Sequence, residues 1–217
     1  MLNLLFNKHQ QDPFNILFLG AHSDDIEIGC GGTILRLVEE YPNLKVTWVV
    51  FGASGTRIDE AQKSAELFLS NITEKSIIIK SFRDGYFPYN GTEIKDCFEE
   101  LKQQLNPDLI FTHYRNDLHQ DHRLIEELTW NTWRNHLILE YEIPKYDGDV
   151  GNPNFFVPLN DKIRCKKVDL LTKYFQSQAN KHWFTPETFN SLMCLRGIEC
   201  KSLSGYAEAF FARKLAI

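Results

Sequence analysis

The chain has 217 residues, of which 24 are Lys or Arg and 29 are Asp or Glu, so its formal net charge is −5. A hydrophobic fraction of 43% and a charged fraction of 24% exclude a disordered chain. The acidic balance excludes nucleic acid as a partner, and no apolar run approaches the ~18 residues of a membrane span. This length suits one α/β domain, and since no repeat or linker divides the sequence, we expect a single domain over residues 1–217.

The cysteines and the first residues predict a compartment. The five cysteines contain no CxxC pair, and the stretch that follows Met1 lacks the basic n-region of a signal peptide. Disulfides are rare in reducing compartments, so we expect a cytoplasmic protein with reduced thiols.

Strand-like and helix-like stretches alternate over the first two thirds of the chain. In chain order the pattern predicts a strand over 15–20, a helix from Gly31 to near Pro42, a strand over 45–51, a helix over 57–69, a strand over 76–82, a helix over 94–105, a strand over 108–113, a helix over 120–134, a strand over 137–143, and helices over 161–177 and 185–201. Repeated βα units predict a Rossmann-like, mostly parallel sheet with helices on both faces. Residues 141–159, rich in Pro, Gly and Asn, are predicted to form an ordered flap loop.

A first polar cluster follows the first predicted strand, where His22, Asp24 and Asp25 fall within four residues. In open α/β sheets, sites form beyond the carboxyl ends of strands, at the point where the strand order reverses. An imidazole with carboxylates suits zinc or another borderline divalent ion. Adjacent aspartates point in different directions, so one can ligate while the other acts on bound water. The alternative is that this cluster only caps the next helix.

A second cluster, residues 113–123, follows the fourth predicted strand and contains three histidines and two aspartates. His119 and His122 are three residues apart, so they share one face of a helical turn. His113 is explained equally well as a solvated surface residue. If zinc takes about three protein ligands, His22, Asp25 and His122 supply them and leave a position for water.

The other polar residues of the two clusters are then free for roles other than binding the metal. Asp24 is free to act as the general base, and His119 is free to donate to a developing oxyanion. Asp121 can hold one of the histidines in the right tautomer through its other ring nitrogen. These residue types predict metal-assisted hydrolysis.

Two motifs resemble those of a known family. Residues 22–33 (HSDDIEIGCGGT) resemble the AHPDDexxGCGGT motif of the LmbE-like (PIG-L) N-acetylglucosamine deacetylases. Residues 116–123 (NDLHQDHR) resemble the second motif of that family, in which HxDH follows an Asp. Ser23 stands where the family usually has proline, which removes a backbone constraint but no ligand. The motif-bearing region runs from about 15 to 211.

The resemblance implies a zinc-dependent hydrolase that removes the acetyl group from an N-acetylated amino sugar. It implies a role for each matching residue: His22, Asp25 and His122 as metal ligands, Asp24 as general base, His119 as the group that polarises the amide carbonyl, Asp121 as the acid supporting it, and Arg57 and Asp84 as contacts of sugar hydroxyls. Relatives with such a flap resemble deacetylases of cell-surface polysaccharide precursors, and the expected substrate is such a sugar, nucleotide-linked or lipid-linked.

Several alternatives stay open from the sequence. The ion is expected to be Zn²⁺, with Fe²⁺ as the alternative. The same site suits a de-N-formylase, an amide hydrolase of thiol-glycosides or an esterase, and a non-catalytic metal- or sugar-binding protein is the rival of another class. Either Asp24 or His119 can protonate the leaving amine, and the flap either closes over a sugar or is an ordinary surface loop. A homo-oligomer is compatible with the sequence.

Overall fold

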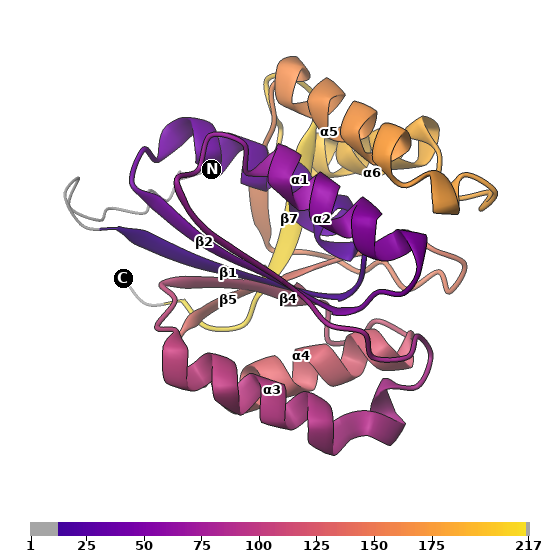
Figure 1. The fold of residues 1–217 in the computed structure, drawn as a ribbon. Helices are drawn as coiled ribbons and strands as arrows, with labels where there is room; N and C mark the ends of the chain where they lie inside the picture. Colours follow the sequence, from indigo (N-terminus) through magenta and orange to yellow (C-terminus); the bar gives the residue numbers. More distant parts are fainter. Residues whose placement is uncertain (1–12, 216–217) are drawn as a thin grey trace.

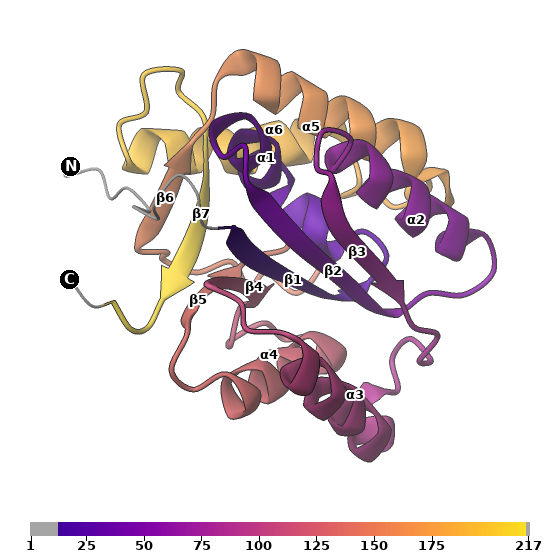
Figure 2. The ribbon, with the colours of Figure 1, turned by 60° about the vertical axis from the view of Figure 1, so that its left-hand side comes forward.

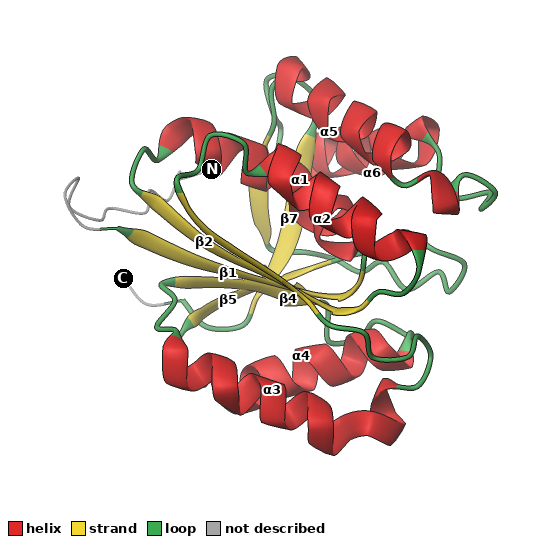
Figure 3. Cartoon of the chain, viewed as in Figure 1, coloured by secondary structure: helices red, strands yellow, loops and turns green. Residues whose placement is uncertain are grey.

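The computed structural model describes residues 13–215, which form a seven-stranded sheet between two layers of helices (Figures 1 and 3). The strands are β1 (Phe14–His22), β2 (Leu44–Gly52), β3 (Glu74–Ile79), β4 (Leu109–His113), β5 (Leu137–Tyr141), β6 (Phe155–Pro158) and β7 (Ala207–Ala212). The helices are α1 (Asp25–Glu40), α2 (Thr56–Phe68), α3 (Gly91–Gln104), α4 (Gln120–Thr132), α5 (Asp161–Tyr174) and α6 (Pro186–Glu199), with 3₁₀ turns η1 (Phe87–Asn90) and η2 (Gln176–Gln178).

The strand order is β3-β2-β1-β4-β5-β7-β6, which places β3 and β6 at the two edges (Figure 2). Strands β1 to β5 are parallel, whereas β7 pairs antiparallel with both β5 and β6. The order reverses between β1 and β4, so the loops that follow these two strands meet at the switch point of the sheet. The predicted Rossmann-like, mostly parallel sheet is confirmed.

Two hydrophobic cores lie on opposite faces of the sheet, because successive side chains of a strand point to opposite faces. Ile16 and Phe18 of β1 belong to the core under α1, α2, α5 and α6, whereas Leu17 and Leu19 belong to the core under α3 and α4 (Figure 1). Strand β1 is therefore buried on both faces, as its continuous apolar run predicts.

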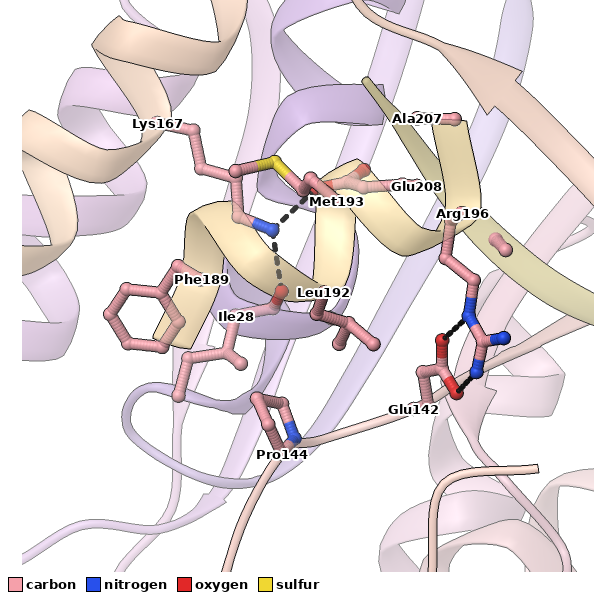
Figure 4. Close-up of a pocket in the computed structure, with 12 residues that line it drawn as sticks. Ile28, Glu142, Pro144, Lys167, Phe189, Leu192, Met193, Arg196, Ala207 and Glu208 are labelled. Carbon is pink, nitrogen blue, oxygen red and sulfur yellow. Dashed lines mark hydrogen bonds and ion pairs between the residues drawn. The ribbon is translucent and has the colours of Figure 1, made fainter. Parts of the chain in front are cut away.

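The first helix was predicted to begin at Gly31, which is wrong. Helix α1 begins at Asp25 and has an irregular turn at Cys30, where φ is −141°. The irregular turn removes main-chain partners from the following residues, and the Glu208 carboxylate of β7 accepts from the N–H groups of Gly32 (2.7 Å) and Thr33 (2.6 Å) instead. Lys167 donates to both Glu208 (2.6 Å) and the Ile28 carbonyl (2.6 Å), as Figure 4 shows.

The C-terminal part of the sheet was not predicted from the sequence. Residues 155–158 lie inside the predicted flap but form the edge strand β6, and β7 was not predicted at all. The alternating βα pattern that identifies the parallel strands ends before both of them, and β6 has only four residues. The flap is consequently an ordered segment between β5 and β6.

All five cysteines are free thiols, as expected. The first twelve residues, on which the expected absence of a signal peptide rests, lie outside the described part of the chain. Among residues 13–215, none of the helices combines the length and the apolar character that crossing a bilayer requires.

Gly29 lets the first turns of α1 approach β5. A Cβ at this position would lie 2.2 Å from Cδ2 of Tyr141, whose hydroxyl donates to the Leu19 carbonyl at 2.6 Å and thereby fixes the ring. We expect Gly29→Ala to lower the free energy of unfolding by about 1–3 kcal/mol through overpacking, measured by denaturant unfolding. Gly91→Ala is the matched control, because a Cβ there meets no atom within 4 Å and its φ is −59°. Equal stability of the two variants would contradict this account.

Candidate active site

The structure brings the eight predicted site residues together at the carboxyl ends of β1 to β4. His22 is the last residue of β1, Asp24 and Asp25 open α1, and His122 lies in the first turn of α4. Arg57 lies in the first turn of α2 and Asp84 in the segment after β3. The parallel sheet thus gathers side chains from four separate loops at its switch point.

His22, Asp25 and His122 form a buried triangle of ligand atoms. His22 Nδ1 lies 3.2 Å from His122 Nε2 and 3.4 Å from Asp25 Oδ2, and the latter two atoms are 3.5 Å apart. Tetrahedral zinc with ligand bonds of 2.0–2.1 Å requires ligand atoms about 3.4 Å apart. The triangle fits three ligands of such an ion and leaves its fourth position for water or substrate.

Each histidine of the triangle turns its other ring nitrogen toward a carboxylate. His122 Nδ1 lies 2.9 Å from Asp117 Oδ2, and His22 Nε2 lies 3.2 Å from Asp121 Oδ2 and 3.1 Å from Asp84 Oδ1. Such carboxylates fix the tautomer of a metal-binding histidine and raise its basicity as a ligand. The arrangement is therefore compatible with a metal site whose two histidine ligands each have a carboxylate partner.

Asp121 faces a different histidine from the one that the resemblance implies. Its carboxylate approaches His22 and is held by the main-chain N–H groups of Gly85 (2.7 Å) and Phe87 (3.1 Å). Only the Asp121 main-chain N–H reaches His119, donating to Nδ1 at 3.2 Å. With Nδ1 as acceptor, the proton of neutral His119 is on Nε2. Burial, and then the charge of His22, lower the pKa of His119, which favours this neutral donor.

Asp24 is buried beside the triangle and bonded to Arg57. The Arg57 Nη2 group donates to Asp24 Oδ1 at 2.7 Å, and Nη1 lies 3.9 Å from Asp84 Oδ2. Burial raises the pKa of Asp24, and the guanidinium partly offsets that rise. Asp84, with a side chain 63% exposed, is the solvent-facing member of this group.

Burial and neighbouring side chains shift the pKa values of the three residues of the triangle. Burial alone would raise the pKa of Asp25, but the His122 and His113 rings outweigh it and hold that pKa well below its usual range. Burial lowers the pKa of His122 to about 4. Burial acts in the same direction on His22, but hydrogen bonds to Asp121, Asp25 and Asp84 raise its pKa well above the usual value. The carboxylates around His22 thus favour its protonated form.

Three residues of the site were not assigned from the sequence. His113 is fully buried, so the surface alternative is wrong: its Nε2 accepts from the Ala21 N–H at 2.9 Å and its ring stacks on His122 at 4.0 Å between centroids. Asp117 supports His122 through its carboxylate. The position of Asp117 in the second motif was the signal that could have identified it. Lys145 of the flap lies 3.0 Å from Asp117, and no local pattern marks it.

Comparison with known proteins defines the class. The family model of the GlcNAc-PI de-N-acetylases (PIG-L) matches residues 17–133, more than half of the chain. The chain belongs to the PIG-L family. By class it is a hydrolytic N-deacetylase.

One sequence relative and two solved structures illustrate what this chain is similar to. The uncharacterized deacetylase YaiS of Escherichia coli K12 is 29% identical over 140 residues, which cover 59% of this chain and 74% of YaiS. The N,N'-diacetylchitobiose deacetylase of Pyrococcus horikoshii has a TM-score of 0.69 at 21% identity, covering 93% of this chain and 84% of its own. The hydratase GalB of Pseudomonas putida KT2440 has a TM-score of 0.68 at 16% identity, covering 94% and 97%. The fold alone therefore does not determine the reaction.

Asp117 should matter to metal binding although it is not a proposed ligand. We expect Asp117→Asn to weaken Zn²⁺ binding about tenfold, since the loss of a supporting acid commonly costs 10- to 100-fold in metal affinity. The measurement is a competition titration with a chromogenic chelator. Asp161→Asn, whose side chain is 73% exposed, is the control. Equal affinities of the two variants would contradict the role of Asp117.

Proposed function

We propose that this chain is a zinc-dependent hydrolase that removes the N-acetyl group from an amino sugar, and that the described α/β unit is its single domain. The observation that carries the proposal is the buried triangle of His22, Asp25 and His122. Its edges fit tetrahedral zinc, both histidines are backed by carboxylates, and Asp24 and His119 lie beside it.

His22 Nδ1, Asp25 Oδ2 and His122 Nε2 would hold the ion. When bound, zinc supplies Lewis acidity, which makes water a nucleophile near neutral pH and polarises the acetyl carbonyl. The same donor set also accepts Fe²⁺, so metal analysis of the purified protein decides between the two ions.

Asp24 takes the proton of the attacking water. Its burial raises its pKa, as suits a general base, while the Arg57 guanidinium partly offsets that rise and fixes the orientation of the carboxylate. His119 donates a hydrogen bond from its Nε2–H group to the oxyanion that develops on the acetyl oxygen, a contribution often worth ~10²–10³ in rate. Protonated Asp24 then delivers its proton to the leaving amine.

The substrate is proposed as an N-acetylated sugar carried on a nucleotide or lipid, a precursor of cell-surface polysaccharide. The family description and the name of the diacetylchitobiose deacetylase both support an acetylated amino sugar. Arg57 and Asp84 lie on the solvent side of the site, where they can meet sugar hydroxyls. We place the enzyme in the cytoplasm.

The direct test is release of free amine from N-acetyl sugars offered free, nucleotide-linked and lipid-linked, with matched N-formyl and O-acetyl compounds. The protein is first stripped of metal and then supplied with Zn²⁺ or Fe²⁺. Zinc-dependent release from an N-acetyl sugar supports the proposal. Release only from the formyl or ester compounds identifies a different acyl hydrolase, and zinc binding without turnover of any compound identifies a binding protein.

Asp24→Asn tests the general base. We expect kcat to fall by about 10²–10⁴ because the amide cannot accept the proton, while the zinc content stays at the wild-type level. Turnover and metal content are measured on the same preparation. Near-normal turnover with zinc bound would show that another group is the base.

Arg57→Met tests the tuning of that base. Because the guanidinium lowers the pKa of Asp24, its loss raises that pKa, and the base becomes ionised only at higher pH. The acidic limb of the kcat/KM profile should therefore move to higher pH, which assays from pH 4 to 9 would detect. A lower kcat/KM with an unmoved limb would restrict Arg57 to substrate binding.

A further inference from the structure

Both ends of the flap segment 142–151 are held by one buried arginine of α6. Arg196 forms two bonds of 2.7 Å to the Glu142 carboxylate, and its Nη2 also donates to the Gly151 carbonyl at 2.9 Å. Figure 4 shows the Arg196–Glu142 pair beside Pro144. The segment therefore leaves and rejoins the body of the molecule at one fixed point, and its middle must be held by other contacts.

Lys145 holds the middle of this segment against the site. Its Nζ lies 3.0 Å from Asp117 Oδ2 and also pairs with Asp149 of the flap. Asp149 in turn accepts from the Leu118 N–H at 2.7 Å. The three charged side chains are 2–8% exposed, so one buried ammonium serves two buried carboxylates.

The Asp117 oxygen that meets Lys145 is the one that meets His122. Asp117 Oδ2 lies 3.0 Å from Lys145 Nζ and 2.9 Å from His122 Nδ1, while Asp117 Oδ1 accepts from the His119 N–H at 2.8 Å. A continuous chain of contacts thus runs from the flap through one carboxylate to a proposed metal ligand.

We propose that Lys145 is a positioning residue that locks the flap onto Asp117 and thereby holds His122 in its metal-binding orientation. The inference rests on the proposed function, because it takes His122 as a ligand of zinc. It assigns to the flap a part in building the metal centre besides any contact with substrate.

The physical reason is the cost of burying carboxylates without a cation. Removing one partner of a buried charge group leaves the remaining charge uncompensated. Without Lys145, Asp117 and Asp149 face each other as buried like charges. The flap then moves away, and Asp117 loses the contact that fixes the oxygen on which His122 rests.

A positioning role and a purely electrostatic role of Lys145 predict opposite changes in zinc affinity when its charge is removed. Removing a positive charge beside a metal site makes the site more negative, which tightens the binding of a cation. Removing a positioning residue weakens binding because a ligand loses its orientation. The zinc dissociation constant of Lys145→Met therefore distinguishes the two roles without an activity assay.

We expect Lys145→Met to weaken Zn²⁺ binding about tenfold, and Lys145→Arg, which keeps the charge, to restore most of the affinity. Hydrogen exchange in residues 143–151 should accelerate in the Met variant alone. Lys162→Met is the matched control, since Lys162 is 77% exposed and pairs only with Glu39 among the contacts described here. In an Asp117→Asn background the effect of Lys145→Met should shrink to less than about threefold, because the two residues act along one path.

If Lys145→Met does not fold, Lys145→Gln, which also lacks the charge but keeps a polar side chain, is measured instead, and the same weakening of Zn²⁺ binding is expected. Unchanged or tighter zinc binding would overturn the proposal, as would an undiminished effect in the Asp117→Asn background. A wild-type protein that binds no zinc, or stays active without metal, would instead overturn the proposed function.

Discussion

The constraint on which this site depends is the burial of many carboxylates close together. Asp24, Asp25, Asp117 and Asp121 all lie within or beside the triangle and are 0–4% exposed. Ionised groups remain buried only when opposite charge and hydrogen bonds compensate them. The chain supplies Arg57 to Asp24, Lys145 to Asp117, and main-chain N–H groups to Asp121. The remaining carboxylate, that of Asp25, contacts His22 and His122 within the triangle.

The same principle fixes the elements that carry the site. Helix α1 presents Asp25, and its irregular turn is satisfied by Glu208, which is itself neutralised by Lys167. The flap is closed at its base by Arg196 and Glu142. Helix α1 and the flap are thus each connected to a buried ion pair whose two partners lie far apart in the chain. These ion pairs hold the segments that lie next to the proposed metal ligands, and fixed ligand orientation favours metal binding.

The features of the fold and the site that could be predicted are those marked by a local sequence pattern. Strands β1 to β5 carry continuous apolar runs separated by helical patterns, so the parallel sheet and its switch point follow from the sequence. The two polar clusters immediately follow β1 and β4, so proximity of His22, Asp25 and His122 was also predictable. The early start of α1 was not, because glycines normally disfavour a helix. Here they are explained by side chains from distant parts of the chain: Tyr141 at Gly29, Phe68 at Gly31, and Leu159 and Glu208 at Gly32. Lys145 was missed because its role also depends on a contact with a distant residue. Its partner Asp117 lies 28 residues earlier, and no motif joins the two.

The antiparallel insertion of β7 has a consequence for the order of assembly. Glu208 reaches back over 175 and 176 residues to the N–H groups of Thr33 and Gly32. The helix that carries Asp25 therefore remains incompletely hydrogen-bonded until β7 has been synthesised and has entered between β5 and β6. Contacts between residues so far apart in the sequence form slowly, because the entropy cost of closing the long loop comes before any contact compensates for it. The helix that follows the first polar cluster thus depends on a strand from the other end of the chain, although two of the three proposed metal ligands lie within the first 25 residues.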